Sequence, residues 1–352
     1  MLFRSCIVET SHGLLIAFLL EKGFPVYPVN PKAANALRTT AGAKTDQIDA
    51  YLLAKTGRFG LADLRRLTPE SSTVQELKTL TRDQDSLVEM QTRLVNQLMA
   101  CLKDYYPVAL QVFGKLQQAC TLRFLQAYPT PQAAASASVA DLAATLRQGK
   151  YPKANTTAAK MVEILHRPQL TASEVTVRAK SRLMLSLVKQ LAVVVEDIAT
   201  YDKEITRLFL SHADNEIWSS LPGAGKRLAP RLLAEWGDDR SRYGDANSVQ
   251  MLAGTAPVAF QSGNYARAHK RFACVKPLRN ALYQFAWEST AQEAWARDYY
   301  QRKRAEGKSH SMAVRALANV WVRIIYRMWI DKTSYHTETF AAAQHAHAKR
   351  AA

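Results

Sequence analysis

The stretch Met184-Leu-Ser-Leu-Val-Lys-Gln-Leu-Ala-Val-Val-Val-Glu-Asp-Ile-Ala-Thr-Tyr-Asp-Lys-Glu-Ile-Thr-Arg-Leu208 carries the cleanest apolar pattern in the chain. Its apolar residues recur in steps of three and four for almost four heptads, at Met184, Leu187, Leu191, Val194, Ile198, Tyr201, Ile205 and Leu208. This spacing predicts either a coiled-coil seam or one buried helix of an ordinary bundle. Either structure requires a partner helix, in this chain or in another copy, so we expect self-association.

The preceding part of the chain is also predicted to be helical. One long helix is expected from Pro69 to about Asp104, with a residue of the apolar stripe at every seventh position, Leu80, Leu87, Leu94 and Cys101. Gln84 and Gln91 interrupt this stripe. Shorter helices and a connector without any motif are expected between the two long helices, where prolines and an Ala-Ser run break the pattern.

The N-terminal residues have the pattern of an α/β unit. A strand is predicted at Cys6–Val8, a helix from Gly13 to Lys22 and a second strand from Pro25 to Val29. A helix that connects two strands implies parallel pairing, and a parallel sheet normally contains more strands than these two. Thr45 is suited to cap a further helix that runs from Asp46 towards Lys55. We therefore predict an incomplete α/β domain.

Composition favours a nucleic-acid partner. The 352 residues include 47 Lys and Arg against 30 Asp and Glu, which gives a net charge of +17. Such a field concentrates polyanions and makes their binding sensitive to salt. The four cysteines are scattered and indicate neither a zinc site nor a disulfide framework. Because no apolar run approaches the roughly 20 residues that span a bilayer, we expect a soluble cytoplasmic protein without membrane contact.

Much of the positive charge lies after about Ala213, where 21 Lys and Arg face 12 Asp and Glu. Residues 217–229 have the pattern of a helix-hairpin-helix, a motif whose backbone amides can hold a phosphate. Its candidate nucleic-acid contacts are Gly223, Gly225, Lys226 and Arg227. Gly-x-Gly turns also join helices in proteins that do not bind nucleic acid.

Four side chains further suggest phosphate chemistry. Ser262 precedes Gly263 and a run of basic residues, which suggests a hydroxyl directed at a phosphate, although a Ser-Gly pair is by itself usually a turn. Glu9 follows the first strand, and Asp46 and Asp49 share one face of the next helix. Carboxylates in such positions can hold Mg²⁺, but each one alone is an ordinary surface residue.

The motifs taken in order resemble the IS110-type family of insertion-sequence transposases. The resemblance rests on Val8-Glu-Thr10, the segments 23–31 and 44–50, Leu221-Pro-Gly-Ala-Gly225, Gly254-x-Ala-Pro257, Gln261-Ser-Gly263 and Leu278-Arg279. It implies a RuvC-like, ribonuclease-H-type domain with an Asp-Glu-Asp-Asp metal site, a coiled-coil segment and a C-terminal transposase domain with a serine nucleophile. It also implies a bacterial, nucleoid-associated recombinase of DNA that is guided by a structured bridge RNA.

Carried over residue by residue, the resemblance makes Glu9, Asp46 and Asp49 the Mg²⁺ ligands and Ser262 the nucleophile. It makes the nearby cations candidate DNA contacts, namely Arg267, Lys270, Arg271 and Arg279. The first Asp has no match, since only eight residues precede Glu9, so roughly 50 residues of a full domain are expected to be absent through a mis-set start or a real truncation. Val275-Lys-Pro277 also departs from the Gly-Asn pair that is usual before Leu-Arg.

The predicted architecture is α/β plus mostly α. It comprises an N-terminally incomplete RuvC-like domain over residues 1–68, a helical coiled-coil and connector region over 69–212, a transposase domain over 213–340 and a disordered tail over 341–352. We expect a homo-oligomer, a dimer or tetramer, in which one chain's carboxylates meet another chain's serine. Two alternatives stay open: a metal-dependent structure-specific nuclease that uses water, and an inactive copy that only binds nucleic acid.

Overall fold

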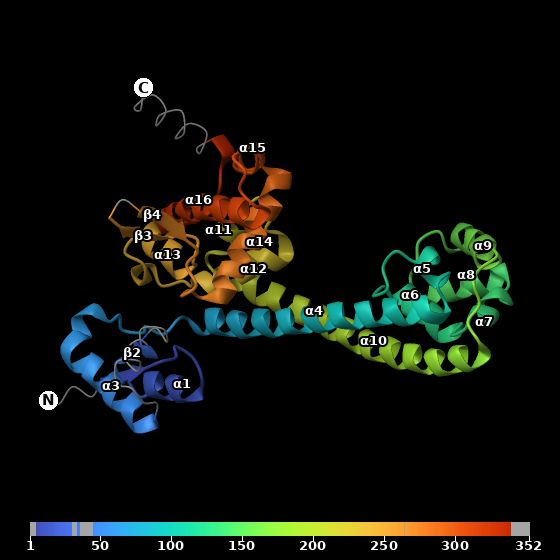
Figure 1. The fold of residues 1–352 in the computed structure, drawn as a ribbon, viewed down its shortest axis with the longest axis horizontal. Helices are drawn as coiled ribbons and strands as arrows, with labels where there is room; N and C mark the ends of the chain where they lie inside the picture. The colour runs from blue at the N-terminus through green and yellow to red at the C-terminus, as the bar shows by residue number, and fades with distance from the viewer. Residues whose placement is uncertain (1–4, 30–33, 36–44, 264, 339–352) are drawn as a thin grey trace. The chain divides into compact units, whose positions relative to one another are not determined.

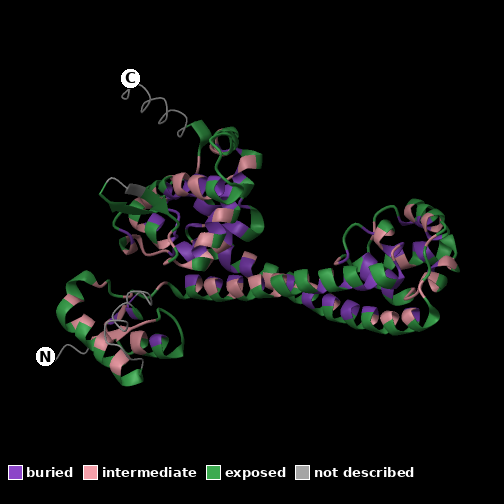
Figure 2. Cartoon of the chain, in the orientation of Figure 1, coloured by how far each residue is buried: buried purple, intermediate pink, exposed green. Residues whose placement is uncertain are grey.

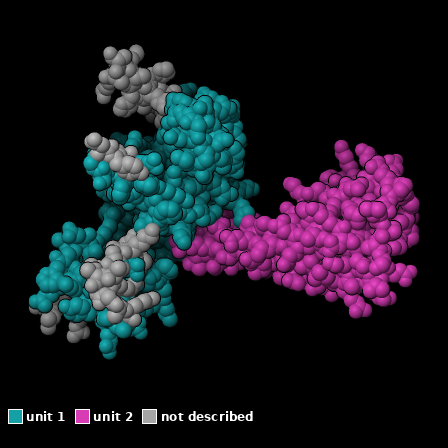
Figure 3. All heavy atoms as spheres, in the orientation of Figure 1, with its two compact units in different colours: residues 1–78, 209–352 teal, residues 79–208 magenta. Residues whose placement is uncertain are grey.

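The computed structural model describes residues 5–29, 34–35, 45–263 and 265–338, and these residues are mostly helical, with short strands paired in twos (Figure 1). The chain forms two compact units (Figure 3). The first contains residues 1–78 and 209–352, and the second contains residues 79–208. The predicted tail and the motif residues Asn30, Pro31 and Lys44 lie outside the described residues.

The N-terminal part of the first unit has the predicted α/β pattern. Strand β1 (Cys6–Val8) pairs in parallel with β2 (Val26–Pro28), and helix α1 (Leu14–Glu21) connects them. Helix α3 (Asp46–Gly60) begins after Thr45, whose side chain accepts a hydrogen bond from the backbone N–H of Ile48. It packs closely on β1, since a Cβ at Gly57 would lie 2.5 Å from Cγ1 of Ile7. The strands, their parallel pairing and the capped helix are confirmed.

Two long helices form the frame of the second unit. These are α4 (Ser72–Tyr105) and α10 (Glu174–Ser211), and they run antiparallel along each other (Figure 1). Near one end the thiol of Cys101 donates to the carbonyl of Lys180 at 3.5 Å, and near the other Gln84 Nε2 donates to Asp202 Oδ1 at 2.6 Å. The predicted interruption of the stripe at Gln84 is therefore a buried amide bonded to the facing helix.

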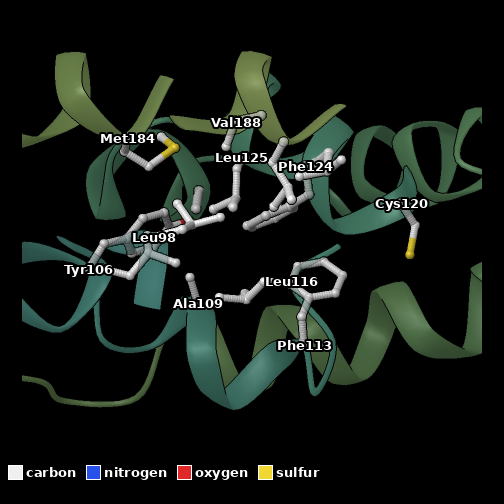
Figure 4. Close-up of a cluster of buried hydrophobic side chains, with 14 of the residues drawn as sticks. Leu98, Tyr106, Ala109, Phe113, Leu116, Cys120, Phe124, Leu125, Met184 and Val188 are labelled. Atoms are coloured by element: carbon white, nitrogen blue, oxygen red, sulfur yellow. The ribbon is translucent and has the colours of Figure 1, made fainter. Parts of the chain in front are cut away.

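Short helices enclose one end of this pair around a common hydrophobic core (Figures 2 and 4). They are α5 (Ala109–Val112), α6 (Ala119–Ala127), α7 (Pro131–Ala135), α8 (Val139–Gln148) and α9 (Ala154–Leu165). Phe113 and Phe124 pack in this core with ring centroids 5.0 Å apart. It also contains Leu98 of α4 and the stripe residues Met184 and Leu191 of α10. The partner helix that the stripe requires is thus α4 of the same chain, and coiled-coil geometry and self-association stay predictions.

The C-terminal part of the first unit is a helical domain with one β-hairpin. Its elements are α11 (Asn215–Ser219), α12 (Gly225–Trp236), the 3₁₀ turn η2 (Arg240–Arg242), α13 (Ala246–Leu252), β3 (Val258–Ser262), β4 (Tyr265–His269), α14 (Lys276–Gln292), α15 (Ala294–Ala305) and α16 (His310–Asp331). Helix α14 packs against both α12 and α16. Fully buried tryptophans fill the interior, and Trp321 donates from Nε1 to the Ser289 hydroxyl at 2.8 Å.

Residues 65–71 bind directly to the segment around η2. Arg65 donates to the carbonyl of Ser241 at 2.8 Å, and the Thr68 hydroxyl donates to Asp239 at 3.0 Å. The Glu70 carboxylate accepts from both Lys78 and Arg242. No helix within the described ranges is both long enough and apolar enough to cross a lipid bilayer.

Candidate functional site

Ser262 lies at the tip of a β-hairpin. It is the last residue of β3 and is paired with Tyr265, the first residue of β4. Gly263 has φ +56°, the left-handed conformation that glycine adopts without steric cost and that two-residue hairpin turns require. All five residues of β3 are exposed. The serine hydroxyl is therefore carried on an exposed turn and is accessible to a large substrate.

The register of the hairpin puts a guanidinium group on the same face as this serine. Residues directly opposite each other in an antiparallel pair project to one face, and alternate residues of a strand share that face. Phe260 is opposite Arg267, and Val258 is opposite His269. Ser262, Phe260 and Arg267 thus share a face, on which the rings of Phe260 and His269 lie 6.0 Å apart. Arg267 is a diagonal neighbour of Ser262.

The loop after β4 folds back against the start of α14. A Cβ at Gly254, which has φ +68°, would lie 2.9 Å from the sulfur of Cys274 and 3.4 Å from the carbonyl oxygen of Arg271. Arg279 on α14 places Nη1 3.7 Å from the same sulfur. The predicted cation Arg279 thus contacts Cys274, and the backbone of Arg271 lies against the same glycine, while Lys270 is an exposed residue beside the ring of Phe272.

The unusual Val275-Lys-Pro277 sequence is accommodated by a helix start. Pro277 occupies the first turn of α14, where its missing N–H and fixed φ are favourable. The N–H of Val275 donates to the carbonyl of Leu252 at 2.8 Å, which anchors the entry to this helix. The departure from the family's Gly-Asn pair therefore leaves a well-formed turn.

The predicted phosphate-binding turn between α11 and α12 is present as a helix–turn–helix segment. Gly223 has φ +81°, and a Cβ there would lie 3.0 Å from the carbonyl oxygen of Glu288, so this glycine permits close packing on α14. A Cβ at Gly225, with φ +55°, would meet nothing within 4 Å. Lys226 and Arg227 are exposed in the first turn of α12. Three of the four predicted contacts thus face open space, and a helix-hairpin-helix function stays a prediction.

The carboxylates expected to hold a metal lie on two neighbouring elements. Asp46 and Asp49 occupy the first turn of α3, where the helix dipole favours negative charge, and Glu9 directly follows β1. The α3–β1 contact lies at Gly57 and Ile7.

Within the described part of the chain, no group of three His, Cys, Asp or Glu side chains is arranged to hold a metal ion. The three carboxylates have suitable chemistry for Mg²⁺, whose ligands are oxygen atoms. They do not form a closed site in this structure.

Two polar side chains that the sequence did not single out adjoin the cations around Cys274. Tyr283 lies one helical turn after Arg279 on α14, and within the described residues its buried O–H group has no acceptor. Arg315 comes from α16 and acts on this tyrosine through its charge and through a side-chain hydrogen bond, in which the guanidinium group can only donate. The spacing of Arg279 and Tyr283 could have indicated a shared face, but no local signal relates Arg315 to them.

Comparison with known proteins gave two matching family models. A model described as a transposase, of the DEDD and IS110 type, matches residues 3–107, and one described as "Transposase IS116/IS110/IS902 family" matches residues 215–301. Glu9, Asp46 and Asp49 lie in the first matched segment and Ser262 in the second. The match to a DEDD transposase domain fits the RuvC-like fold predicted for the N-terminal region.

Similar curated proteins extend over most of the chain. The mini-circle putative transposase for IS117 of Streptomyces coelicolor is 34% identical over 323 residues, which cover 89% of this chain and 77% of the relative. The IS900 uncharacterized 42 kDa protein of Mycobacterium paratuberculosis is 31% identical, with 94% of this chain and 83% of the relative covered. The IS116 uncharacterized 44.8 kDa protein of Streptomyces clavuligerus is 30% identical, with 91% and 80% covered.

Proposed function

Because this chain belongs to the IS110 family of insertion-sequence transposases, we propose that it cleaves and rejoins DNA through a phosphoserine bond at Ser262. Family membership implies DNA as the substrate and transposition as the process. The observation that carries the serine mechanism is the position of Ser262, an exposed hydroxyl at the tip of a hairpin whose same face bears Arg267.

The proposed reaction conserves the phosphodiester bond energy. The Ser262 oxygen attacks a backbone phosphorus atom and forms a new P–O bond, while the bond from phosphorus to one sugar oxygen breaks. The serine proton is given up and the leaving sugar oxygen is protonated, so the products are a phosphoserine linkage and a free sugar hydroxyl. Attack by another strand's sugar hydroxyl reverses these steps and rejoins the DNA without ATP.

Positive charge close to the hairpin supports this step. A phosphate under attack gains negative charge, and guanidinium groups stabilise such charge through bidentate hydrogen bonds. Arg267 shares the serine's face, and Lys270 and Arg271 follow at the end of β4. We propose Arg267 as the side chain that orients the scissile phosphate, with Lys270, Lys226, Arg227 and the Gly223–Gly225 turn as contacts to the neighbouring DNA backbone.

Glu9, Asp46 and Asp49 are the residues that we propose for a divalent metal, Mg²⁺. Bound there, the ion would polarise a phosphate oxygen. Since these carboxylates do not form a closed site in this structure, no step of the proposed reaction is assigned to the ion.

RNA guidance and pairing of two chains complete the proposal. Both come from the family resemblance, in which a bridge RNA selects the DNA and one protomer's carboxylates act with another's serine. Mixing a Ser262→Ala chain with an Asp46→Ala chain tests the pairing, and restored strand exchange is expected. No restoration, while tagged chains still co-assemble, would rule out such a shared site.

Covalent trapping tests the serine mechanism. Incubation of the full chain with its terminal DNA and guide RNA is expected to give a protein–DNA adduct that survives denaturant, and Ser262→Ala is expected to abolish it. Gln261→Ala, in the neighbouring exposed position of β3, is the matched control and should keep the adduct. Cleavage that persists in Ser262→Ala without any adduct would instead indicate a metal-dependent nuclease that uses water. DNA binding with no cleavage by the parent chain would indicate an inactive copy.

A further inference from the structure

Three segments far apart in the sequence meet around Cys274. Gly254 packs against the sulfur of Cys274 and the carbonyl of Arg271, and Arg279 of α14 reaches the same sulfur. The residue after Gly254, Thr255, donates from its hydroxyl to Asn319 Oδ1 of α16 at 2.9 Å. Arg315 lies one helical turn before Asn319 and therefore shares its face of α16. The loop, α14 and α16 thus bring polar side chains together.

The polar groups of this cluster lack the partners that buried groups normally have. In the described structure the buried Nε–H of Arg271 has no acceptor, and neither has the buried O–H of Tyr283, because Arg315 can only donate to that oxygen. Among the described residues, Arg279 makes long contacts, at 3.7 Å to the sulfur of Cys274 and 3.5 Å to Oδ1 of Asn280. Unsatisfied buried polar groups are rare in native proteins and call for an explanation such as an absent ion.

The charged side chains of the cluster are all positive. Burial raises the pKa of Tyr283, while the guanidinium groups of Arg315 and Arg279 act in the opposite direction. Within the described residues, none of the three arginines is paired with a carboxylate. The cluster combines several guanidinium groups with a hydroxyl donor, and no carboxylate of the described residues is paired with them. Such a set of donors suits a ligand that carries several oxygen atoms and negative charge.

We propose that Arg271, Arg279, Arg315 and the Tyr283 hydroxyl form one binding site for a phosphodiester group of DNA, beside the end of strand β4. Arg271 lies two residues after this strand, in the loop that leads from the Ser262 hairpin. The choice of DNA rests on the proposed function, in which the hairpin acts on a DNA phosphate. A phosphate in this site would hold the strand at a position near the scissile one and would satisfy the two orphaned donors.

Equilibrium binding to a duplex DNA oligonucleotide, measured by fluorescence anisotropy over a KCl series, tests the site. All variants are made in the Ser262→Ala full chain, so the outcome is independent of whether serine is the nucleophile. Arg315→Gln is expected to reduce the slope of log affinity against log salt by about 0.9, the effect of one lost phosphate contact. Arg323→Gln is the matched control, because it removes the same charge from an exposed position of α16.

Tyr283→Phe separates binding from folding. It removes a hydroxyl whose O–H has no acceptor in the described structure and whose oxygen is contacted by the Arg315 guanidinium, so the midpoint of thermal unfolding should change little. Loss of a hydrogen bond to a charged phosphate is expected to weaken DNA binding by about tenfold without changing the salt slope.

Three results would overturn the proposal. The first is an equal slope of log affinity against log salt for Arg315→Gln and Arg323→Gln. Arg315 would then contribute no more to DNA binding than an arginine on the surface. The second is unchanged DNA affinity in Tyr283→Phe. The third is a loss confined to duplex RNA of the same sequence, tested in parallel, because the site would then belong to RNA.

Discussion

Single residues in the α11–α12 turn show how similar sequence features can have different structural roles. Gly223 and Gly225 both adopt positive φ, where a side chain is strained. Only Gly223 is also restricted by space, since a Cβ there would press on the backbone of Glu288. The sequence predicts phosphate contact for both glycines, which stays a prediction, and the structure gives the first one a packing role as well.

Alanine substitution should separate these two roles. Both Gly223→Ala and Gly225→Ala are expected to lose ~1–2 kcal/mol of unfolding free energy from the left-handed backbone. Gly223→Ala should lose a further ~1–3 kcal/mol because the neighbouring backbone must move. Urea unfolding of both variants measures the difference, and equal losses would contradict the packing role.

Asp239 is a second residue whose role the structure defines. Hydrogen bonds from Ser241, and further ones from Thr68, hold the pKa of this carboxyl below its usual value, against the smaller opposing effect of burial. A lowered pKa in the folded state stabilises the protein above the ordinary aspartate pKa of ~3.9, and this contribution is lost as the pH falls through the lowered value.

Asp239→Asn should therefore be less stable than the parent by a constant amount between pH 7 and pH 5. This difference is expected to shrink below about pH 4, as the parent's carboxyl becomes protonated. Thermal unfolding at several pH values measures it, and Ser241→Ala, which removes the donating hydroxyl, should reproduce part of the loss. A stability difference between the variant and the parent that grows below pH 4 would contradict this role of Asp239.

At the scale of elements, the apolar stripe of α10 predicted a helix and the need for a partner but not which partner. Leu191 is fully buried in the core shared with α4 and the short helices, whereas Val193, two residues along, is 59% exposed. The same helix therefore offers a buried position and an exposed one. Elements defined by residues within one or two turns were predicted well, including the strands of the N-terminal region and the Thr45 cap.

Leu191→Ala is expected to cost about 2–5 kcal/mol of unfolding free energy, because it leaves a cavity in this core. Val193→Ala should change stability by less than about 0.5 kcal/mol. Thermal unfolding combined with light scattering distinguishes packing within the chain from an interface. A change of oligomeric state in Leu191→Ala without loss of stability would assign the stripe to contacts between chains.

At the scale of the whole molecule, the excess of basic residues is concentrated in one region. Residues 213–352 carry a net charge of +9 out of +17, from 21 Lys and Arg less 12 Asp and Glu. The hairpin, the α11–α12 turn and the arginine cluster all belong to this region. Its charge should dominate the affinity for DNA.

Binding of the full chain to duplex DNA should accordingly weaken more than tenfold when KCl is raised from about 50 to 200 mM, since each phosphate contact releases counterions. A plot of log affinity against log salt measures the number of contacts. A slope near zero would contradict a backbone-binding surface.

The sequence by itself determined the helices, the short parallel strands, the basic C-terminal region and the family, because periodicity, caps and motifs depend on residues close together in the chain. Only the tertiary structure decided that α4 is the partner of the α10 stripe, that Gly223 packs on α14 and that Glu9, Asp46 and Asp49 do not form a closed metal site. It alone brought Arg315 towards Tyr283. Such contacts depend on how distant helices pack, and no local pattern records that packing.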